Sequence, residues 1–333
     1  TGNNGRGGYT YTPIPVPPPS TAIRKTKTLT KNFVASATEP NAGEGKYVSA
    51  LYPSLTAYTQ TNPMIVNMNN FDLTVKAESN DKAARAIFLG ANAAVDIQNA
   101  TGKTLTIKAT NSSTKAASGI YLDGNSTLTI AGPVVIDEVT SQGYSTSGIV
   151  TGGGIENSSS VTINGSLTIR KIQGKETEEA GDGRNLSALN TLSGESSITV
   201  NGDADIQNIK GSVIKVNGTT GYKQGGTVRI GGGVLRAAAD PGKEKQYRLV
   251  SQKTGNVYIN MAGAAPGTRK TVLKGDMYVV SESGKRAQEY GGGTLTDYAH
   301  DGTLNVALTT NDSSWHGASL YEETTTGTAE GGY

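Results

Sequence analysis

The sequence predicts an all-β protein, a right-handed three-faced parallel β-helix (β-solenoid) with N-terminal and C-terminal caps. Three short apolar strands recur in a fixed order, once in every unit of about 30 residues. The clearest unit has strands at Ile120-Tyr121-Leu122, Leu128-Thr129-Ile130 and Val134-Val135-Ile136. Each strand places two apolar side chains on one face of an extended segment. One unit cannot bury that face alone, so the units are expected to stack.

The strand positions align from one unit to the next. In the second strand the first apolar residue recurs at intervals of 29 to 37 residues. The intervals in the third strand lengthen and shorten in the same units. The aligned second-strand residues are Val95, Leu128, Val161, Ile198, Val228 and Val257. We expect these side chains to form one inward column at the parallel-strand spacing of about 4.8 Å. The first strand follows through Ile87, Ile120, Ile149, Ile214 and Tyr247, with Asn190 and Leu192 in the irregular unit.

Glycine-containing corners separate the second and third strands. Asn164-Gly165 and Asn201-Gly202 occupy this place in two units, and Ala131-Gly132 and Gly231-Gly232 occupy it in two others. Taken singly, the Asn-Gly pairs would indicate hairpins. Because they recur at one point of the unit, we interpret them as corners of a coil turned by left-handed Asn or Gly. Propeller blades need four strands, and helical repeats need a 3.6-residue period that is not found.

The chain divides into four segments. Residues 1–22 form a Pro/Gly-rich N-terminal segment, and residues 23–66 are expected to form an N-terminal cap and an irregular first turn. The β-helix with its C-terminal capping segment is predicted for residues 67–318, followed by a flexible tail at 319–333. The lone tryptophan, Trp315, is expected to plug the C-terminal end of the coil.

Composition excludes several function classes. The net charge is +2, from 30 basic and 28 acidic residues of interspersed sign, so the chain lacks the basic footprint of a nucleic-acid-binding protein. Because the chain has no Cys, disulfides and thiolate metal sites are excluded. No apolar run approaches the length of a membrane-spanning helix, and no leader peptide is retained. We predict no metal and no cofactor.

The C-terminal region resembles the end of the passenger domain of bacterial autotransporters. Residues 302–318 run from a strand, Thr303-Leu304-Asn305-Val306-Ala307-Leu308, into Asn311-Asp312-Ser313-Ser314-Trp315-His316-Gly317. That family carries an Asn-Ser-Ser-Trp-Thr-Gly-like motif there, and His316 departs from its usual Thr. The resemblance implies a secreted, cell-surface protein attached to the outer membrane of a Gram-negative-type bacterium. The family's C-terminal membrane barrel is missing from this chain.

The sequence gives little support for a set of catalytic residues. Hydrolysis of glycosides needs two carboxylates that converge across coils. Asp203 and Asp205 share a face, but the aligned positions in the preceding units are not acidic. Asp137 and Glu138 are expected to point to opposite sides of their strand. The only histidines, His300 and His316, both lie in the C-terminal segment, which disfavours nucleophilic catalysis.

The unit alignment also predicts a surface pair. Asp137 and Arg170 each follow an inward isoleucine directly and are 33 residues apart. They should therefore be neighbours on the surface, in an ion pair that contributes at most about 1 kcal/mol.

We therefore expect an adhesin rather than an enzyme, with a host-surface glycan or protein, or a second cell bearing the same protein, as its partner. The alternative is a polysaccharide lyase or glycoside hydrolase, which convergent acids with an Arg or Lys in a groove would favour. Binding is predicted at the loops that interrupt the repeat, above all the insertion 173–186, because a rigid scaffold holds such loops in place. The candidate binding residues are Tyr144, Glu176, Glu178, Glu179 and Asp182.

Overall fold

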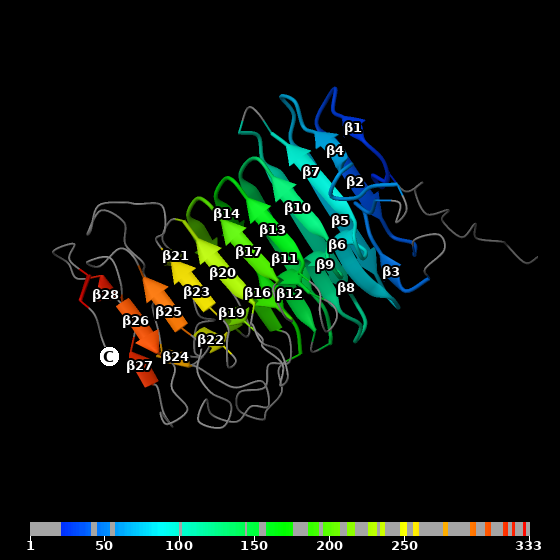
Figure 1. The fold of residues 1–333 in the computed structure, drawn as a ribbon. Coiled ribbons are helices and arrows are strands. Elements are labelled where there is room, and N and C mark those ends of the chain that lie inside the picture. The colour runs from blue at the N-terminus through cyan, green and yellow to red at the C-terminus, as the bar shows by residue number, and fades with distance from the viewer. Residues whose placement is uncertain are drawn as a thin grey trace, which may run out of the picture.

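The computed structural model describes three parallel sheets wound into a solenoid (Figure 1). The described residues are 21–40, 45–53, 57–99, 102–143, 145–152, 158–175, 186–192, 196–206, 212–216 and 226–231, together with the backbone of short strands beyond 231. Secondary structure in these residues consists of strands, and none of them forms a helix long and apolar enough to span a membrane. The all-β parallel solenoid predicted from the sequence is confirmed.

Each turn of the solenoid contributes one strand to each sheet. Sheet B contains, in spatial order, β1 (Lys27–Thr28), β4 (Met64–Asn67), β7 (Ala94–Gln98), β10 (Thr127–Ile130), β13 (Ser160–Ile163), β17 (Ser197–Val200), β20 (Thr227–Ile230), β23 (Asn256–Ile259), β25 (Thr294–Asp297) and β26 (Leu304–Ala307). Figure 1 shows its strands in order from β1 at the upper right to β26 at the lower left.

The other two sheets repeat this order. Sheet C contains β2 (Phe33–Ala37), β5 (Leu73–Ser79), β8 (Leu105–Asn111), β11 (Val134–Thr140), β14 (Leu167–Ile169), β18 (Ala204–Ile206) and β21 (Val234–Arg236), with β15 (Ile172–Gln173) beside β11. Sheet A contains β3 (Tyr47–Val48), β6 (Ala83–Leu89), β9 (Ala117–Leu122), β12 (Thr146–Thr151), β16 (Leu186–Thr191), β19 (Ser212–Val216), β22 (Tyr247–Ser251), β24 (Asp276–Tyr278) and β27 (His316–Ala318). A separate antiparallel pair joins β28 (Glu322–Glu323) and β29 (Ala329–Glu330).

The predicted inward column of sheet B is present. Leu128 pairs with Val95 on one side and with Val161 on the other, in parallel register. The pairing continues through Ile198 and Val228 to Val257. From Val95 to Val228 these side chains are at most 2% exposed. Stacked aliphatic residues of this kind fill the interior, so the core is a column along the solenoid axis.

The first-strand alignment is wrong in two units. In β16 the inward residues are Leu189 and Thr191, which pair with Ile149 and Thr151, and not Asn190 and Leu192. In β22 the residue that pairs with Ile214 is Leu249, because the register shifts between Ser212 and Ile214. The β16 error is one residue, which inverts the faces of the strand, whereas the β22 error is two residues, which keeps them. Insertions precede both strands, so the spacing alone did not define the register.

Residues 23–66, where we predict an N-terminal cap and an irregular first turn, contain strands in the same parallel register as the later coils. Phe33, Ala35 and Ala37 of β2 pair with Leu73, Val75 and Ala77 of β5. Short strands β1 and β3 pair with β4 and β6. The small alanines of β2 gave a weak apolar signal, so the sequence did not reveal this coil.

Two antiparallel strands form the C-terminal edges. β26 pairs antiparallel with β25 at the end of sheet B, and β27 pairs antiparallel with β24 at the end of sheet A. These strands fall within the segment for which we predict the C-terminal cap. Trp315 lies outside the described residues.

The corner between sheets B and C needs glycine for a reason that differs from the prediction. Neither Asn164 nor Asn201 has a positive φ; among the described non-glycine residues, positive φ occurs at Asn69, Asn92 and Asn125. Instead, the corners of successive coils stack closely. A Cβ on Gly165 would lie 2.5 Å from the carbonyl carbon of Gly132, and one on Gly202 would lie 2.9 Å from that of Gly165.

Asparagine side chains stack beside these glycines. The Asn201 Nδ2 donates a hydrogen bond of 2.8 Å to the Asn164 Oδ1 of the preceding coil. The backbone amides of both residues continue the ladder, donating to Ile163 and Ile130 at 2.8 Å. Asparagine therefore satisfies polar groups at the corner, while the adjacent glycine permits the close approach.

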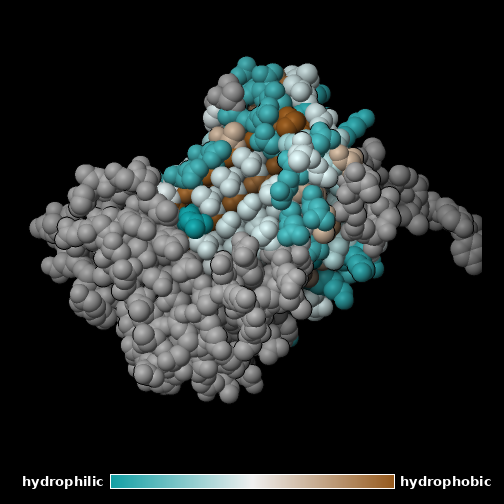
Figure 2. Space-filling view, in the orientation of Figure 1, coloured by the Kyte–Doolittle hydropathy of each residue, from teal (hydrophilic) through white to brown (hydrophobic). Residues whose placement is uncertain are grey.

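The outward residues of sheet B are mostly small hydroxyl side chains. Thr129, Thr162 and Thr199 are in register in successive coils, and all three are half-buried. Figure 2 shows the middle of this face as pale with narrow brown strips, and teal side chains gather along its borders. This face therefore offers a hydroxyl array with few charges.

Candidate binding groove

A groove of about 890 Å³ lies along the edge where sheet C turns into sheet A. It crosses several coils, since its lining comes from β5, β8, β11 and β15, from the corners beside these strands and from the segment that follows β2. The lining residues are Thr38, Glu39, Pro40, Glu78, Ser79, Asn80, Asp81, Thr110, Asn111, Ser112, Glu138, Thr140, Ser141, Gln142, Lys171 and Gln173. Hydroxyl, amide and carboxylate groups predominate, and no aromatic ring contributes.

The pairing of sheet C explains why these residues meet. Lys108 is aligned with Glu138, and Thr110 with Thr140, in neighbouring strands. Thr140 is also aligned with Gln173 on its other side. These side chains alternate with buried Ala109 and Val139, so they stand on the outer face of the sheet. The groove floor is thus a ladder of polar side chains on consecutive coils.

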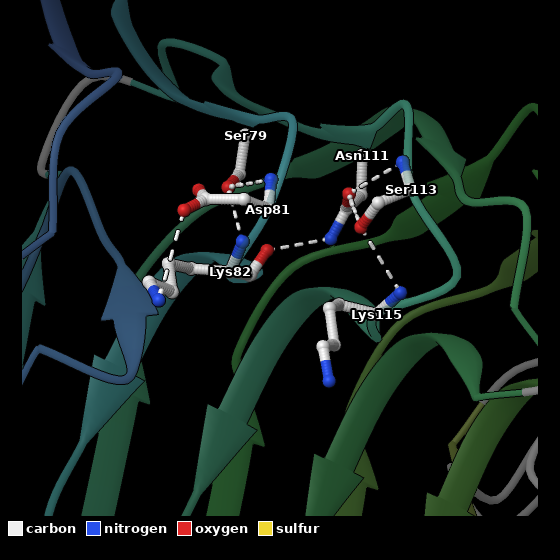
Figure 3. A network of polar contacts seen from close by, with 6 residues as sticks. All are labelled: Ser79, Asp81, Lys82, Asn111, Ser113 and Lys115. Carbon is white, nitrogen blue, oxygen red and sulfur yellow. Dashed lines mark hydrogen bonds and ion pairs between the residues drawn. The ribbon is translucent and has the colours of Figure 1, made fainter.

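The walls of the groove are turns fixed by their own side chains, as Figure 3 shows. Ser79 Oγ accepts a hydrogen bond of 3.0 Å from the backbone amide of Lys82. Asn111 is almost fully buried, and its Nδ2 donates a bond of 2.6 Å to the Lys82 carbonyl oxygen in the preceding coil. Its Oδ1 accepts bonds of 2.9 Å and 2.8 Å from the amide and hydroxyl of Ser113. Buried amides that bridge coils hold these turns in one conformation.

The charges of the floor are paired with one another. Glu138 contacts Lys108 Nζ at 2.6 Å through one carboxylate oxygen and Lys171 Nζ at 2.9 Å through the other. Glu78 is paired with Lys76 at 2.7 Å. Hydrogen bonds from Lys108 and then Lys171 lower the pKa of Glu138, and the hydrogen bond to Glu138 raises the pKa of Lys108.

A β-bulge brings two adjacent acids to the same side, which corrects the sequence-based prediction. The register of β11 against β8 shifts between Ile136 and Glu138. Asp137 and Glu138 therefore both face solvent, where Asp137 pairs with Arg170 and Glu138 with the two lysines. Strict alternation had placed them on opposite faces. The predicted Asp137–Arg170 pair is confirmed, at 2.9 Å and with both side chains exposed.

The protonation states of this cluster suit binding better than proton transfer. A general acid near neutral pH needs a raised carboxyl pKa, whereas the pKa of Glu138 is lowered. A general base needs a lowered ammonium pKa, whereas that of Lys108 is raised. Within the described residues no group of three or more His, Cys, Asp or Glu is placed to hold a metal ion. The cluster can thus donate and accept hydrogen bonds with fixed charges.

The predicted binding residues Tyr144, Glu176, Glu178, Glu179 and Asp182 lie outside the described residues. Their neighbours in sequence are described: Gln142 and Gln173 both line the groove. The insertion 173–186 therefore begins at the groove. The groove itself was not predicted, although the recurrence of Lys76, Lys108, Glu138 and Lys171 at steps of 30 to 33 residues carries the signal.

Replacing Glu138 tests how much its ion pairs with Lys108 and Lys171 contribute to stability. Because its pKa is lowered in the fold, Glu138 contributes stability above its unfolded pKa, and this stability is lost as the pH falls through the folded pKa. We expect Glu138→Gln to lower the free energy of unfolding by about 1 kcal/mol at pH 7. The difference from the original protein should shrink in acid, below a pH of about 4. Urea unfolding at several pH values measures both effects.

Asp137→Asn is the matched control, because it removes a carboxylate from the same bulge but from a more exposed pair. We expect it to cost under about 0.5 kcal/mol. An equal loss in both variants, or a Glu138→Gln effect that is constant with pH, would contradict the assignment.

Comparison of the chain with protein-family models, with curated proteins and with solved structures finds no match in any of the three.

Proposed function

We propose from the geometry that this protein is a surface-displayed adhesin that binds an extended polar ligand along the groove. The observation that carries the proposal is the groove across successive coils, whose turns are fixed by bridging hydrogen bonds and in which Glu138 is paired with Lys108 and Lys171. A repeated polar ladder supplies many small contacts to one long ligand. The ligand class is a glycan chain or an extended protein segment on another cell.

The predicted binding loop is part of the same proposal. Gln173, the first residue of the acidic insertion, lines the groove, so we include Glu176, Glu178, Glu179 and Asp182 among the proposed contacts. The resemblance of residues 302–318 to autotransporter passengers supports display at a bacterial outer membrane. A protein displayed there can also bind a copy of itself on a second cell, which is the alternative form of adhesion. Both remain part of the proposal.

Filling the groove floor should abolish adhesion without unfolding the protein. Thr140→Lys places a long cationic side chain between Thr110 and Gln173, and we expect at least a tenfold loss of binding to the glycan or cell surface that the original protein recognises. Thr162→Lys is the matched control, because it changes a half-buried outward Thr on sheet B. Glycan arrays and a cell-aggregation assay measure the loss, and thermal unfolding checks the fold.

Deletion of residues 175–184 distinguishes binding by the loop from binding by the polar ladder of the groove floor. If the loop makes the contacts, adhesion falls in the deletion variant and unfolding changes little. Loss in Thr162→Lys with normal binding in Thr140→Lys and in the deletion would reject the groove and transfer the site to the Thr-rich face of sheet B.

A polysaccharide lyase or hydrolase is the second candidate, because acids and a lysine do converge in the groove: Glu78, Asp81, Glu138 and Lys171. The ion pairs of Glu138 argue for binding instead. Incubation with acidic and neutral polysaccharides distinguishes the two. Chain shortening that Glu138→Gln abolishes would establish the enzyme, and intact polysaccharide that stays bound would favour the adhesin.

A further inference from the structure

A second polar site lies on the outer face of sheet A, near the N-terminal end and apart from the groove. Arg85 of β6 is 8% exposed, and its guanidinium carbon lies 3.8 Å from the ring centroid of Tyr47 and 3.5 Å from that of Tyr121. Phe88 lies 5.0 Å from the same carbon. The three rings come from β3, β6 and β9, so a single coil cannot form the cluster.

Aromatic contacts continue away from Arg85. Phe88 packs against Tyr47 and Tyr121, with ring centroids 4.9 Å and 6.0 Å apart, and it stacks parallel to Tyr52 at 5.5 Å. Tyr47 and Tyr121 remain half-buried, whereas Tyr52 and Phe88 are buried. Tyr121 lies between the inward residues Ile120 and Leu122 and faces outward, but neighbouring rings and Arg85 cover much of it.

Arg85 is hydrogen-bonded to the Tyr47 and Tyr121 side chains, but two of its buried nitrogens lack an acceptor. Nε and Nη1 of Arg85 are buried and make no hydrogen bond, and the same holds for Oγ of Ser49. Val48 pairs with Ala84 and Leu51 bridges Ile87, so Ser49 and Arg85 are aligned in adjacent coils. The two residues with unsatisfied atoms therefore occupy the same register position on neighbouring strands. A buried cation is normally paired with an anion, and buried donors are normally bonded.

Among the residues that the structure describes, none supplies an anion that pairs with Arg85. Asp123 acts on Arg85 electrostatically, but its Oδ1 accepts a hydrogen bond of 3.1 Å from the amide of Gly124. No ion pair joins Arg85 to a described acid within 4.0 Å. Aromatic rings pack against the guanidinium, so an acceptor must approach along the edge where the N–H bonds point.

We propose that Arg85 is the anchor of a binding site for a carboxylate group, carried by an acidic sugar such as a uronic acid residue of a polysaccharide. A planar guanidinium matches a carboxylate, and a monoanion neutralises its single charge in a dry aromatic site. Tyr47, at the half-exposed margin, turns aside to admit the ligand, and the Ser49 hydroxyl donates the additional hydrogen bond. The site is independent of the groove and of the proposed adhesion.

Nuclear magnetic resonance on the full chain tests the site through the Arg85 Nε–H signal, which is identified by its absence from Arg85→Lys. The probes are D-glucuronate, acetate, D-glucose and inorganic phosphate. We expect saturable shifts with glucuronate, a half-saturation at least tenfold higher with acetate, and no shift with glucose. Arg85→Lys should weaken glucuronate binding at least tenfold by calorimetry, since the planar fork is lost while the charge remains.

Arg24→Lys is the control, because Arg24 lies over the Tyr52 ring at 5.7 Å and outside the unsatisfied cluster. It should leave glucuronate binding unchanged. The other signals and thermal unfolding establish that each variant is folded. Equal shifts with phosphate would show an adventitious ion only, and an unshifted Arg85 signal or unchanged affinity in Arg85→Lys would overturn the proposal.

Discussion

Leu128→Ala should lower the free energy of unfolding by about 3 kcal/mol, because it removes a fully buried side chain from the middle of a stacked column. Leu128 is 1% exposed and lies between Val95 and Val161. The coils above and below are held by their own hydrogen bonds, so the cavity cannot collapse freely. Urea unfolding followed by circular dichroism measures the change.

Thr129→Ala, on the same strand, is the control for backbone and propensity effects. Thr129 faces outward and is half-buried, so its loss should cost under about 0.5 kcal/mol. Similar costs at both positions would mean that the two faces of β10 do not differ in packing.

Gly165→Ala should destabilise the protein by about 3 kcal/mol, although it adds one methyl group. The new Cβ would lie 2.5 Å from the Gly132 carbonyl carbon and 2.6 Å from the Pro133 nitrogen. Both are backbone atoms of the neighbouring coil, so relief requires separation of the stacked corners and of their hydrogen bonds. Thermal and urea unfolding report the loss.

Gly102→Ala separates crowding from backbone strain. Gly102 has a φ of +66° but nothing within 4 Å of a Cβ, so only the left-handed conformation is penalised, by about 1 kcal/mol. If Gly165→Ala costs no more than Gly102→Ala, the corners are not closely stacked.

The repeat was readable from the sequence where inward residues are large and spacing is regular. Leu128 and Val161 illustrate this, as does the Asp137–Arg170 pair. The register predicted from the sequence is wrong at Leu189, where an insertion precedes the strand. It also failed at Glu138, where a bulge breaks the alternation of faces. Bulges and register shifts arise from contacts between coils, which local periodicity does not encode.

The two candidate sites show a related limit. The groove depends on Asn111 bridging to the preceding coil, and the Arg85 cluster joins rings from three strands of sheet A. Polar and aromatic residues on outward positions look alike in a sequence whether they are solvated or packed. Only the register across coils shows which ones meet.

Because the glycine corners stack closely, the three edges of the solenoid differ in how readily they accept inserted residues. From β10 to β21, three residues connect sheet B to sheet C in every coil, whereas the connections from sheet C to sheet A vary from 3 to 12 residues up to β16. At the closely stacked corners of Gly165 and Gly202, extra atoms would meet the backbone of the neighbouring coil. New loops can therefore be grafted, or acquired in evolution, at the edge that bears the groove, while the glycine edge sets the axial pitch of the rod.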